Sequence, residues 1–506
     1  MRLNPESMSL AELRQLWSGA EARLDDASMQ RVTESAAAID RIVAGGETVY
    51  GVNTGFGLLA NTRIPNHRLA ELQTNLILSH SAGLGDPLPR HVTRLMILLK
   101  LLGLGRGYSG VRPLVIQALQ RLLDADAMPV IPSQGSVGAS GDLAPLAHLI
   151  AALMGYGNID VAGSVSPARD ALKKIGLDEL VLGPKEGLAL INGTQASTAL
   201  ALDALFLGER VFAAAIAAGA LAVDALKGSI CPFDPRLHDL RGQPGQIAVA
   251  AAIRGLLDES EIGASHPDCG RVQDPYSFRC QPQVMGASLD LLQNAARTLT
   301  IEAGAVTDNP IVFGAGGDND SDSAISGGNF HAQPVAFAAD IIAIALCEVG
   351  SISERRTSVL VDPKMSGLPA FLTPDSGVNS GLMIPQVTAA ALVSENKSLA
   401  FPASVDSIPT SAGQEDHVSM APISARKAGT IARNAAGVIA VELMAGAEGI
   451  DYHAPLKTSP KLQAIHAAVR AHSPHFTADR YWADEMSALQ RAVLAGEIGA
   501  NGVALS

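Results

Sequence analysis

The chain has 506 residues, of which 47% are hydrophobic and 4% aromatic, and a formal net charge of -13 at pH 7. A chain of this length can bury a large core without disulfide staples. Its acidic balance disfavours nucleic acid and anionic membranes as partners, because like charges repel, and we expect a small molecule or a second copy of the chain instead.

The amino-terminal segment, MRLNPESMSLAELRQLW, has charged and polar residues where a secretory signal needs an apolar core. The cysteines are widely spaced and form no CxxC pair, so neither a disulfide framework nor a zinc site is indicated: Cys231, Cys269, Cys280 and Cys347. These features predict a cytoplasmic protein, and we expect no metal.

Helices dominate the predicted structure, because alanine and leucine are abundant and aromatic residues are few. Six long apolar or amphipathic segments have the pattern of core helices: 91–103, 195–226, 284–304, 333–356, 383–399 and 419–449. The longest apolar run, Val211 to Val223, is shorter than the ~20 residues that cross a bilayer. We interpret this run as part of a buried helix.

Segments rich in Gly, Pro, Asn and Asp separate these helices and are predicted to be loops: 51–57, 81–90, 104–113, 131–145, 228–246, 313–328 and 361–381. Neither a low-complexity linker nor a repeat divides the chain. We expect a mainly α fold in which residues 1–200 form a smaller amino-terminal lobe and residues 201–506 form a central bundle of long helices with further carboxy-terminal helices. One continuous domain is the alternative.

The most unusual local sequence is GSVGASGDLAPLAH, residues 135–148, which leads directly into an apolar helix. A phosphate loop needs a lysine that is absent here, and a dinucleotide fingerprint needs a preceding strand. A nucleophile elbow would need glycine two residues after Ser140, where Asp142 stands. Two interpretations remain. Either this is a helix-entry loop capped by Asp142, or the amide nitrogen of Gly141 attacks the carbonyl carbon of Ala139, and loss of two waters closes a ring and converts Ser140 into a dehydroalanine.

The triad Ala139-Ser140-Gly141 resembles the one from which the aromatic amino acid ammonia-lyases form their methylidene-imidazolone (MIO) prosthetic group. Further blocks resemble that family in its order along nearly the whole chain: YGVNTGFG (50–57), LILSHSAGLG (76–85), EGLALINGTQ (186–195), VQDPYSFRCQPQVMG (272–286), AVTDNP (305–310), SGGNFHA (326–332) and QEDHVSM (414–420). The resemblance implies a long helical bundle of the ammonia-lyase and fumarase-like type, MIO without an external cofactor, and a homotetramer with shared active sites.

An electrophile of this kind answers a chemical need. Ammonia is a poor leaving group and the β-proton is weakly acidic, while a general base alone contributes ~10² to 10⁴-fold. Covalent activation of the amine divides the reaction into easier steps. A helix amino terminus, such as the one near Leu143, would stabilise negative charge arriving on the ring oxygen.

The resemblance also assigns roles to single residues. Tyr50 is the first choice for the base that removes the β-proton and Tyr276 the second, although a phenol with a pKa of about 10 needs a lowered pKa or a concerted transfer. Arg279 would pair with the substrate carboxylate. Asn192 and Gln273 would lie beside the prosthetic group and substrate, and Phe330 would line an aromatic pocket. Without the resemblance, Arg279 is as typical of a surface salt bridge. Asn192 and Gln273 are then typical of capping or turn structure, and Phe330 of plain core.

Two positions discriminate between aromatic substrates. The Ser79-His80 pair resembles that of histidine-specific members, so His80 is predicted to bind substrate. Glu415 adds a carboxylate that is costly to bury against a phenyl ring but can accept a hydrogen bond from an imidazole N–H. The alternatives are a core histidine and a solvated acidic run with Asp416. Whether Glu415 only orients the ring or also moves a proton stays open.

The implied activity is that of a carbon–nitrogen lyase converting L-histidine into trans-urocanate and ammonia, the first step of histidine degradation. The alternatives within the enzyme class are a phenylalanine or tyrosine ammonia-lyase and an aminomutase. A fumarase or aspartase relative is disfavoured because its GSSxMPxKxN signature is absent. A catalytically silent scaffold is the alternative outside that class.

Overall fold

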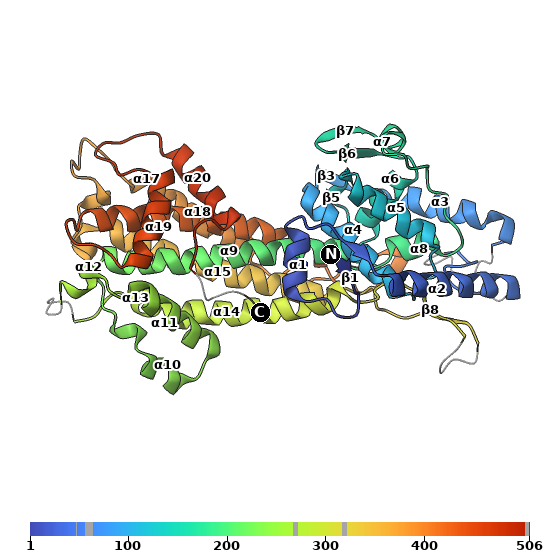
Figure 1. Cartoon of the computed structure of the whole chain (residues 1–506), viewed down its shortest axis with the longest axis horizontal. Coiled ribbons are helices and arrows are strands. Elements are labelled where there is room, and N and C mark those ends of the chain that lie inside the picture. Colours follow the sequence, from blue (N-terminus) through green and yellow to red (C-terminus); the bar gives the residue numbers. More distant parts are fainter. Residues whose placement is uncertain (47, 56–63, 267–271, 316–320, 501–504, 506) are drawn as a thin grey trace. The chain divides into compact units, whose positions relative to one another are not determined.

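The computed structural model describes residues 1–46, 48–55, 64–266, 272–315, 321–500 and 505 (Figure 1). Helices make up most of this part of the chain and the strands are short, which confirms the predicted mainly α fold. Two compact units are present. Unit 1 consists of Met1–Asp203, Arg297–Ala339 and Pro402–Arg426, and unit 2 consists of Ala204–Ala296, Asp340–Phe401 and Lys427–Ser506.

Four long helices contribute to both units, since the boundaries between the units fall within them: α9 (Gln195–Ala225), α14 (Gln281–Ala303), α15 (Gln333–Val361) and α18 (Ala421–Asp451). They correspond to four of the six predicted core helices. The other two are α4 (Arg90–Gly105) and α17 (Met383–Leu399). Unit 1 thus combines the first 203 residues with two later segments, and the predicted boundary near residue 200 stays a prediction.

The remaining helices of unit 1 are short to medium in length: α1 (Leu10–Trp17), α2 (Asp26–Gly45), α3 (Leu69–His80), α5 (Pro113–Asp124), α6 (Leu143–Leu153), α7 (Ala168–Lys174), α8 (Glu186–Ile191) and the 3₁₀ turns η2 (Asn66–Arg68) and η5 (Ser411–Gly413). Their ends follow local chemistry. Ser9 and Glu12 form a reciprocal capping box at the start of α1, and Gly46 ends α2 in the left-handed conformation.

Short strands accompany these helices, several of them inside segments predicted to be loops. The pairs are β1 (Arg2–Leu3) with β2 (Arg23–Leu24), β3 (Leu84–Pro87) with β5 (Pro132–Gln134), β4 (Ala127–Pro129) with β6 (Asn158–Val161), β6 with β7 (Ser164–Pro167), and β8 (Ile311–Phe313) with β9 (Ser323–Ile325). The loop predictions for 81–90, 131–145 and 313–328 were therefore partly wrong. The glycine and proline residues of these segments are typical of loops. Some of the strands form by pairing with residues far away in the sequence, as Leu84 does with Gln134.

Unit 2 contains α10 (Pro235–Arg241), α11 (Pro244–Leu257), α12 (Glu261–Ala264), α13 (Tyr276–Arg279), α16 (Pro363–Ser366), α19 (Pro460–His472), α20 (Trp482–Ala495) and the turns η3 (Cys231–Phe233) and η4 (Ala370–Leu372). Small residues allow its long helices to approach closely. An added Cβ at Gly208 of α9 would lie 3.0 Å from Leu346 of α15, and one at Gly446 of α18 would lie 3.1 Å from Leu221 of α9.

The longest apolar run lies inside α9, as predicted, and Ala213 is its one residue that is not fully buried. By length and composition α9 and α15 could each cross a membrane, but 83% and 67% of their most apolar windows are buried within the protein. Burial of this extent is typical of core helices in a folded body. The long apolar helices are therefore explained by packing.

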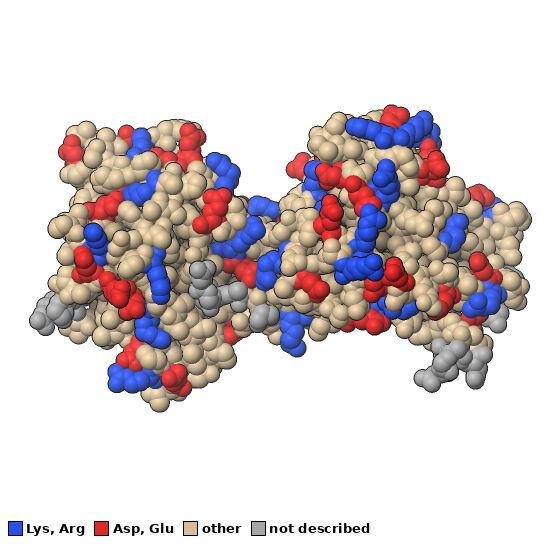
Figure 2. Space-filling model, in the orientation of Figure 1, with Lys and Arg blue, Asp and Glu red and all other residues tan. Residues whose placement is uncertain are grey.

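Charged side chains of both signs are interspersed on the visible face of the molecule, with Lys and Arg beside Asp and Glu (Figure 2). Among the ion pairs of unit 1 that reach the surface are Arg23 with Asp124 at 2.8 Å and Arg68 with Glu71 at 2.8 Å. Exposed pairs of this kind contribute little to stability.

Candidate active site

Three helices of unit 1 bring predicted site residues together. Helices α3, α6 and α8 pack against one another. His80 is the last residue of α3, Asn192 follows the last residue of α8, and the triad ends two residues before α6 begins at Leu143. Helix ends that meet in this way place His80, Ser140 and Asn192 at one location.

The triad forms a tight turn that requires glycine at its third position. Ser140 has φ 50° and Gly141 has φ 83°, both in the left-handed region. The amide nitrogen of Gly141 faces the carbonyl oxygen of Gly138 at 3.4 Å, and a Cβ added to Gly141 would lie 2.3 Å from the carbonyl oxygen of Gly193. The chain segment at Gly193 leaves no room for a side chain there.

Asp142 does not cap the helix that follows it, so that interpretation was wrong. Its side chain instead accepts hydrogen bonds from the main-chain N–H of Ser197 at 2.6 Å and from the Ser197 hydroxyl at 2.9 Å, in the first turn of α9. Its own N–H donates to the Gly193 carbonyl at 2.7 Å. Burial raises the pKa of Asp142 to about 6. Asp142, which directly follows the triad, is therefore hydrogen-bonded to the first turn of α9.

Asn192 links the triad to a buried lysine. Its side-chain amide donates a 2.8 Å hydrogen bond to the carbonyl oxygen of Ser140. Its own carbonyl accepts a 2.8 Å hydrogen bond from the ammonium group of Lys100, which also reaches Gln195 at 3.3 Å. Lys100 is 1% exposed, and burial lowers its pKa to about 7. Lys100 was not predicted as a site residue, because a lysine inside an apolar helix pattern gives no local indication of what it contacts.

A pocket of about 850 Å³ opens beside the triad in unit 1. Six predicted site residues line it: Tyr50, His80, Ser140, Asn192, Phe330 and Glu415. Leu76, Leu143, Leu188 and Ile191 supply an apolar wall. The pocket therefore combines an apolar surface with a few polar groups, as small-molecule sites do.

Three hydroxyl groups hold the carboxylate of Glu415 in place. Its Oε1 accepts a 2.9 Å hydrogen bond from the Ser140 hydroxyl, and its Oε2 accepts from Thr410 at 2.7 Å and Ser411 at 2.9 Å. The segment that carries it also contacts the triad loop, since the N–H of Met420 donates to the carbonyl of Val137 at 2.9 Å. These contacts favour a site residue over a solvated acidic run.

His80 presents one ring nitrogen to its own helix. Its Nδ1 lies 2.8 Å from the carbonyl oxygen of Leu76 and 3.0 Å from the Ser79 hydroxyl. A carbonyl oxygen can only accept, so the hydrogen of the neutral ring belongs on Nδ1 and Nε2 is left as an acceptor. The ring borders the pocket, where this acceptor can meet a polar substrate group.

Further pocket residues were not singled out from the sequence, although they stand inside the blocks that carry the family resemblance: Asn309, Ser326, Gly327, His331, Gln414, Asp416 and His417. Asn309 orders the segment before Phe330, because its side chain bonds both the Ser326 hydroxyl at 3.1 Å and the N–H of Gly327 at 2.7 Å. The rings of His331 and His417 lie 5.6 Å apart. These two histidines could have been predicted from the sequence, because His331 directly follows Phe330 and His417 is close to Glu415.

Gln273, Tyr276 and Arg279 belong to unit 2 and are absent from the lining of this pocket. Gln273 and Arg279 instead line a second pocket of about 360 Å³ within unit 2. Tyr276 is 72% exposed, and the Arg279 guanidinium lies 4.4 Å from the centre of its ring. The two units of one chain thus each present part of the predicted set.

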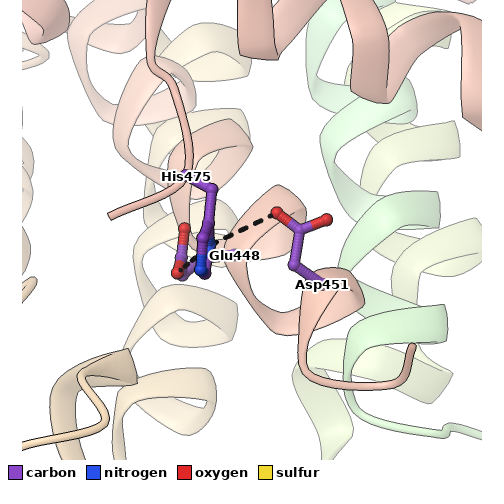
Figure 3. A group of neighbouring side chains, drawn as sticks. All are labelled: Glu448, Asp451 and His475. Carbon is purple, nitrogen blue, oxygen red and sulfur yellow. Dashed lines mark ion pairs between the residues drawn. The ribbon is translucent and has the colours of Figure 1, made fainter. Parts of the chain in front are cut away.

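One group of neighbouring acidic and histidine side chains in the described part of the chain has the spacing of a metal site: Glu448, Asp451 and His475 (Figure 3). Arg470 donates to Glu448 at 2.8 Å and to Asp451 at 2.5 Å, and Nδ1 of His475 lies 2.8 Å from Glu448. One guanidinium group already pairs with both carboxylates, so we interpret the cluster as an ion-pair network. The expectation of no metal stays a prediction.

The chain is similar to known proteins over nearly its whole length. The model of the aromatic amino acid lyase family matches residues 8–471. A histidine ammonia-lyase of Paracidovorax citrulli (strain AAC00-1) is 57% identical over 489 residues, covering 96% of this chain and 94% of that protein. The crystal structure of histidine ammonia-lyase from Trypanosoma cruzi superimposes with a TM-score of 0.90 at 40% identity, covering 98% of this chain and 94% of that one. Tyrosine aminomutase from Streptomyces globisporus gives a TM-score of 0.92 at 33% identity, with coverages of 98% and 97%.

Proposed function

The chain belongs to the aromatic amino acid lyase family, and from this premise we propose that it is a carbon–nitrogen lyase that eliminates ammonia from L-histidine to give trans-urocanate. One observation carries the proposal. Ser140 is joined to Asn192 through its carbonyl oxygen at 2.8 Å and to Glu415 through its hydroxyl at 2.9 Å, at the wall of a pocket that His80 also borders.

The residues of the triad fit the MIO group that the family implies. The left-handed turn at Ser140 and Gly141 is the kind of backbone bend that ring closure through the Gly141 nitrogen needs, and the lack of space for a Cβ explains why glycine stands at this position. Asn192 donates to the Ser140 carbonyl, whose oxygen would become the ring oxygen. When present, MIO supplies an electrophilic methylidene that bonds to the substrate and activates the amine for departure.

The chain's own residues would then bind and orient histidine. The Nε2 acceptor of His80 and the carboxylate of Glu415 provide polar contacts at the pocket wall, and Glu415 can accept a hydrogen bond from the imidazole ring. Phe330 and Leu188 supply apolar surface for its carbon edge. A carboxylate and a histidine in the wall disfavour a phenyl ring, because Nε2 of His80 and, once the Ser140 hydroxyl is lost, Oε1 of Glu415 would be desolvated without a hydrogen-bond partner.

Tyr50 is our choice for the base that removes the β-proton. It lines the same pocket as Ser140 within one chain, whereas Tyr276, the second choice, lies in unit 2 and would enter such a pocket as the residue of another copy. The amino terminus of α6, which starts at Leu143 close to the triad, would favour negative charge on the ring oxygen together with the Asn192 amide.

A homotetramer with shared sites explains the placement of the remaining residues. Gln273, Tyr276 and Arg279 of one copy would complete the pocket of another. Large apolar side chains are exposed on the long helices of unit 2, including Ile344 of α15 at 45% and Ile384 of α17 at 59%, which supports burial between copies. Mixing Ser140→Ala and Tyr276→Phe subunits during expression should restore activity that neither variant has alone. Mixed oligomers that stay inactive would contradict shared sites.

The activity is tested with the purified protein. Incubation with L-histidine should release urocanate and ammonia, and incubation with L-phenylalanine or L-tyrosine should yield little cinnamate or coumarate. A β-amino acid as the main product would identify an aminomutase instead. Mass analysis of the peptide containing Ser140 should show the loss of two waters. We also propose a cytoplasmic location, supported by the few and widely spaced cysteines.

A further inference from the structure

The contact between Ser140 and Glu415 joins two residues that are 275 positions apart in the sequence, with the serine hydroxyl donating to Oε1 of the carboxylate at 2.9 Å. Both line the pocket of unit 1. A contact to the imidazole ring of a substrate does not require Glu415 to bind this hydroxyl. The hydroxyl is the group that Ser140 loses when MIO forms.

We propose that Glu415 carries the proton transfer that removes the hydroxyl group of Ser140 as water, so that the same carboxylate first builds the electrophile and later faces the substrate. This inference rests on the proposed function, because it concerns how the prosthetic group of that reaction is made.

The chemistry proceeds in two dehydrations. In the first, the Gly141 nitrogen bonds to the carbonyl carbon of Ala139, and the Ala139 oxygen leaves as water with the amide hydrogens of Gly141 and Ser140. In the second, the Cα–H bond of Ser140 breaks and its electron pair forms the Cα–Cβ double bond. The Cβ–Oγ bond breaks, and Oγ leaves as water with its own hydrogen and a second proton. The carboxylate of Glu415 takes the Cα proton, returns one proton to Oγ and ends unchanged.

The surroundings of Glu415 suit this role. Thr410 and Ser411 both donate to Oε2, at 2.7 Å and 2.9 Å, which fixes the carboxylate and directs Oε1 to the Ser140 hydroxyl. Loss of the Cα proton places negative charge on the Ser140 carbonyl oxygen, where the Asn192 amide donates at 2.8 Å. Ser140 thus has a proton carrier, Glu415, at its hydroxyl and a hydrogen-bond donor, Asn192, at the carbonyl oxygen where the negative charge develops.

The order of the two dehydrations gives the test a distinct signature. The full chain and its variants are synthesised in a cell-free system, and samples are quenched over time. The mass of the peptide containing Ser140 is then measured by mass spectrometry. The wild type should lose two waters. Glu415→Gln should accumulate a peptide that has lost one water, with the second loss slowed by about 10²-fold or more, the usual contribution of a positioned acid–base group. Glu415→Asp keeps a carboxylate and should be slowed less.

Glu34→Gln is the matched control, because Glu34 is an exposed carboxylate on α2 whose partner is Gln30, and it should mature as the wild type does. Thermal unfolding establishes that each variant is folded. If Glu415→Gln loses both waters at the wild-type rate, the inference is overturned and the proposed function stands. If it loses none while remaining folded, Glu415 shapes the loop before ring closure, and the assigned step is also overturned. A wild-type chain that loses both waters but releases no urocanate from histidine would instead overturn the proposed function.

Discussion

The side-chain amide of Asn192 donates a 2.8 Å hydrogen bond to the carbonyl oxygen of Ser140, while the carbonyl of the same asparagine is held by the buried ammonium group of Lys100 at 2.8 Å. A donor fixed in this way needs no reorganisation when charge develops on the oxygen that it faces. The arrangement connects the interior of unit 1 to Ser140, the residue that the proposed chemistry modifies.

Replacing Asn192 with alanine should lower the turnover number for histidine by about 10² to 10³-fold, the usual effect of removing one such donor. The turnover number is expressed per mole of protein whose Ser140 peptide has lost both waters. This separates an effect on the elimination of ammonia from an effect on maturation, the two dehydrations that form the prosthetic group. An unchanged turnover number on this basis would show that the hydrogen bond has no part in the reaction.

The Ser140→Ala variant should have no measurable activity and should keep its thermal unfolding midpoint, because Ser140 is a surface residue of the pocket and its hydroxyl contributes one polar contact. Urocanate formation and near-ultraviolet circular dichroism measure the two properties. Full activity in this variant would refute the assignment of the triad.

Gly141→Ala should prevent dehydration of the Ser140 peptide and destabilise the protein by about 1–3 kcal/mol, since a Cβ there would lie 2.3 Å from the Gly193 carbonyl oxygen. Gly163→Ala is the matched control, because Gly163 also has a positive φ of 91° but has nothing within 4 Å of an added Cβ. It should mature normally. If both variants mature equally, the lack of space for a side chain is not the reason why glycine is needed at position 141.

The buried Lys100 predicts a specific pH dependence of stability. Burial lowers its pKa from 10.5 to about 7, so between these pH values the unfolded chain binds more protons than the folded one, and the free energy of unfolding rises with pH. This contribution is lost as the pH falls through about 7. The difference in unfolding free energy between wild type and Lys100→Met should therefore increase from pH 7 to pH 10.5, as measured by urea denaturation. A difference that is constant over this range would contradict the assigned pKa.

In unit 2, Arg356 and Glu442 form an ion pair with both side chains fully buried. Arg356→Met should destabilise the protein by about 3–5 kcal/mol, because it leaves a buried carboxylate without its partner. Adding Glu442→Leu should recover much of the loss. Arg68→Met, which breaks an exposed pair with Glu71, is the control and should have little effect on the denaturation midpoint.

Much of the fold could be predicted from local patterns. The Ala- and Leu-rich segments gave six helices close to their observed bounds, such as α17 at Met383–Leu399, because apolar periodicity is a property of neighbouring residues. The strands β3 and β5 were missed, since their pairing joins Leu84 to Gln134. For the same reason the sequence did not indicate that segments 297–339 and 402–426 belong to unit 1.

The candidate site divides in the same way. The residue types available to the site follow from the order of amino acids alone: a triad with glycine at its third position, the Ser79-His80 pair and a carboxylate at position 415, all in blocks that resemble one family. Three contacts arise only when the chain folds: the Ser140 hydroxyl meets Glu415, Asp142 binds α9 instead of capping α6, and Lys100 supports Asn192. Hydrogen bonds between residues far apart in the chain depend on how helices pack, and packing is set by the whole core rather than by any local segment.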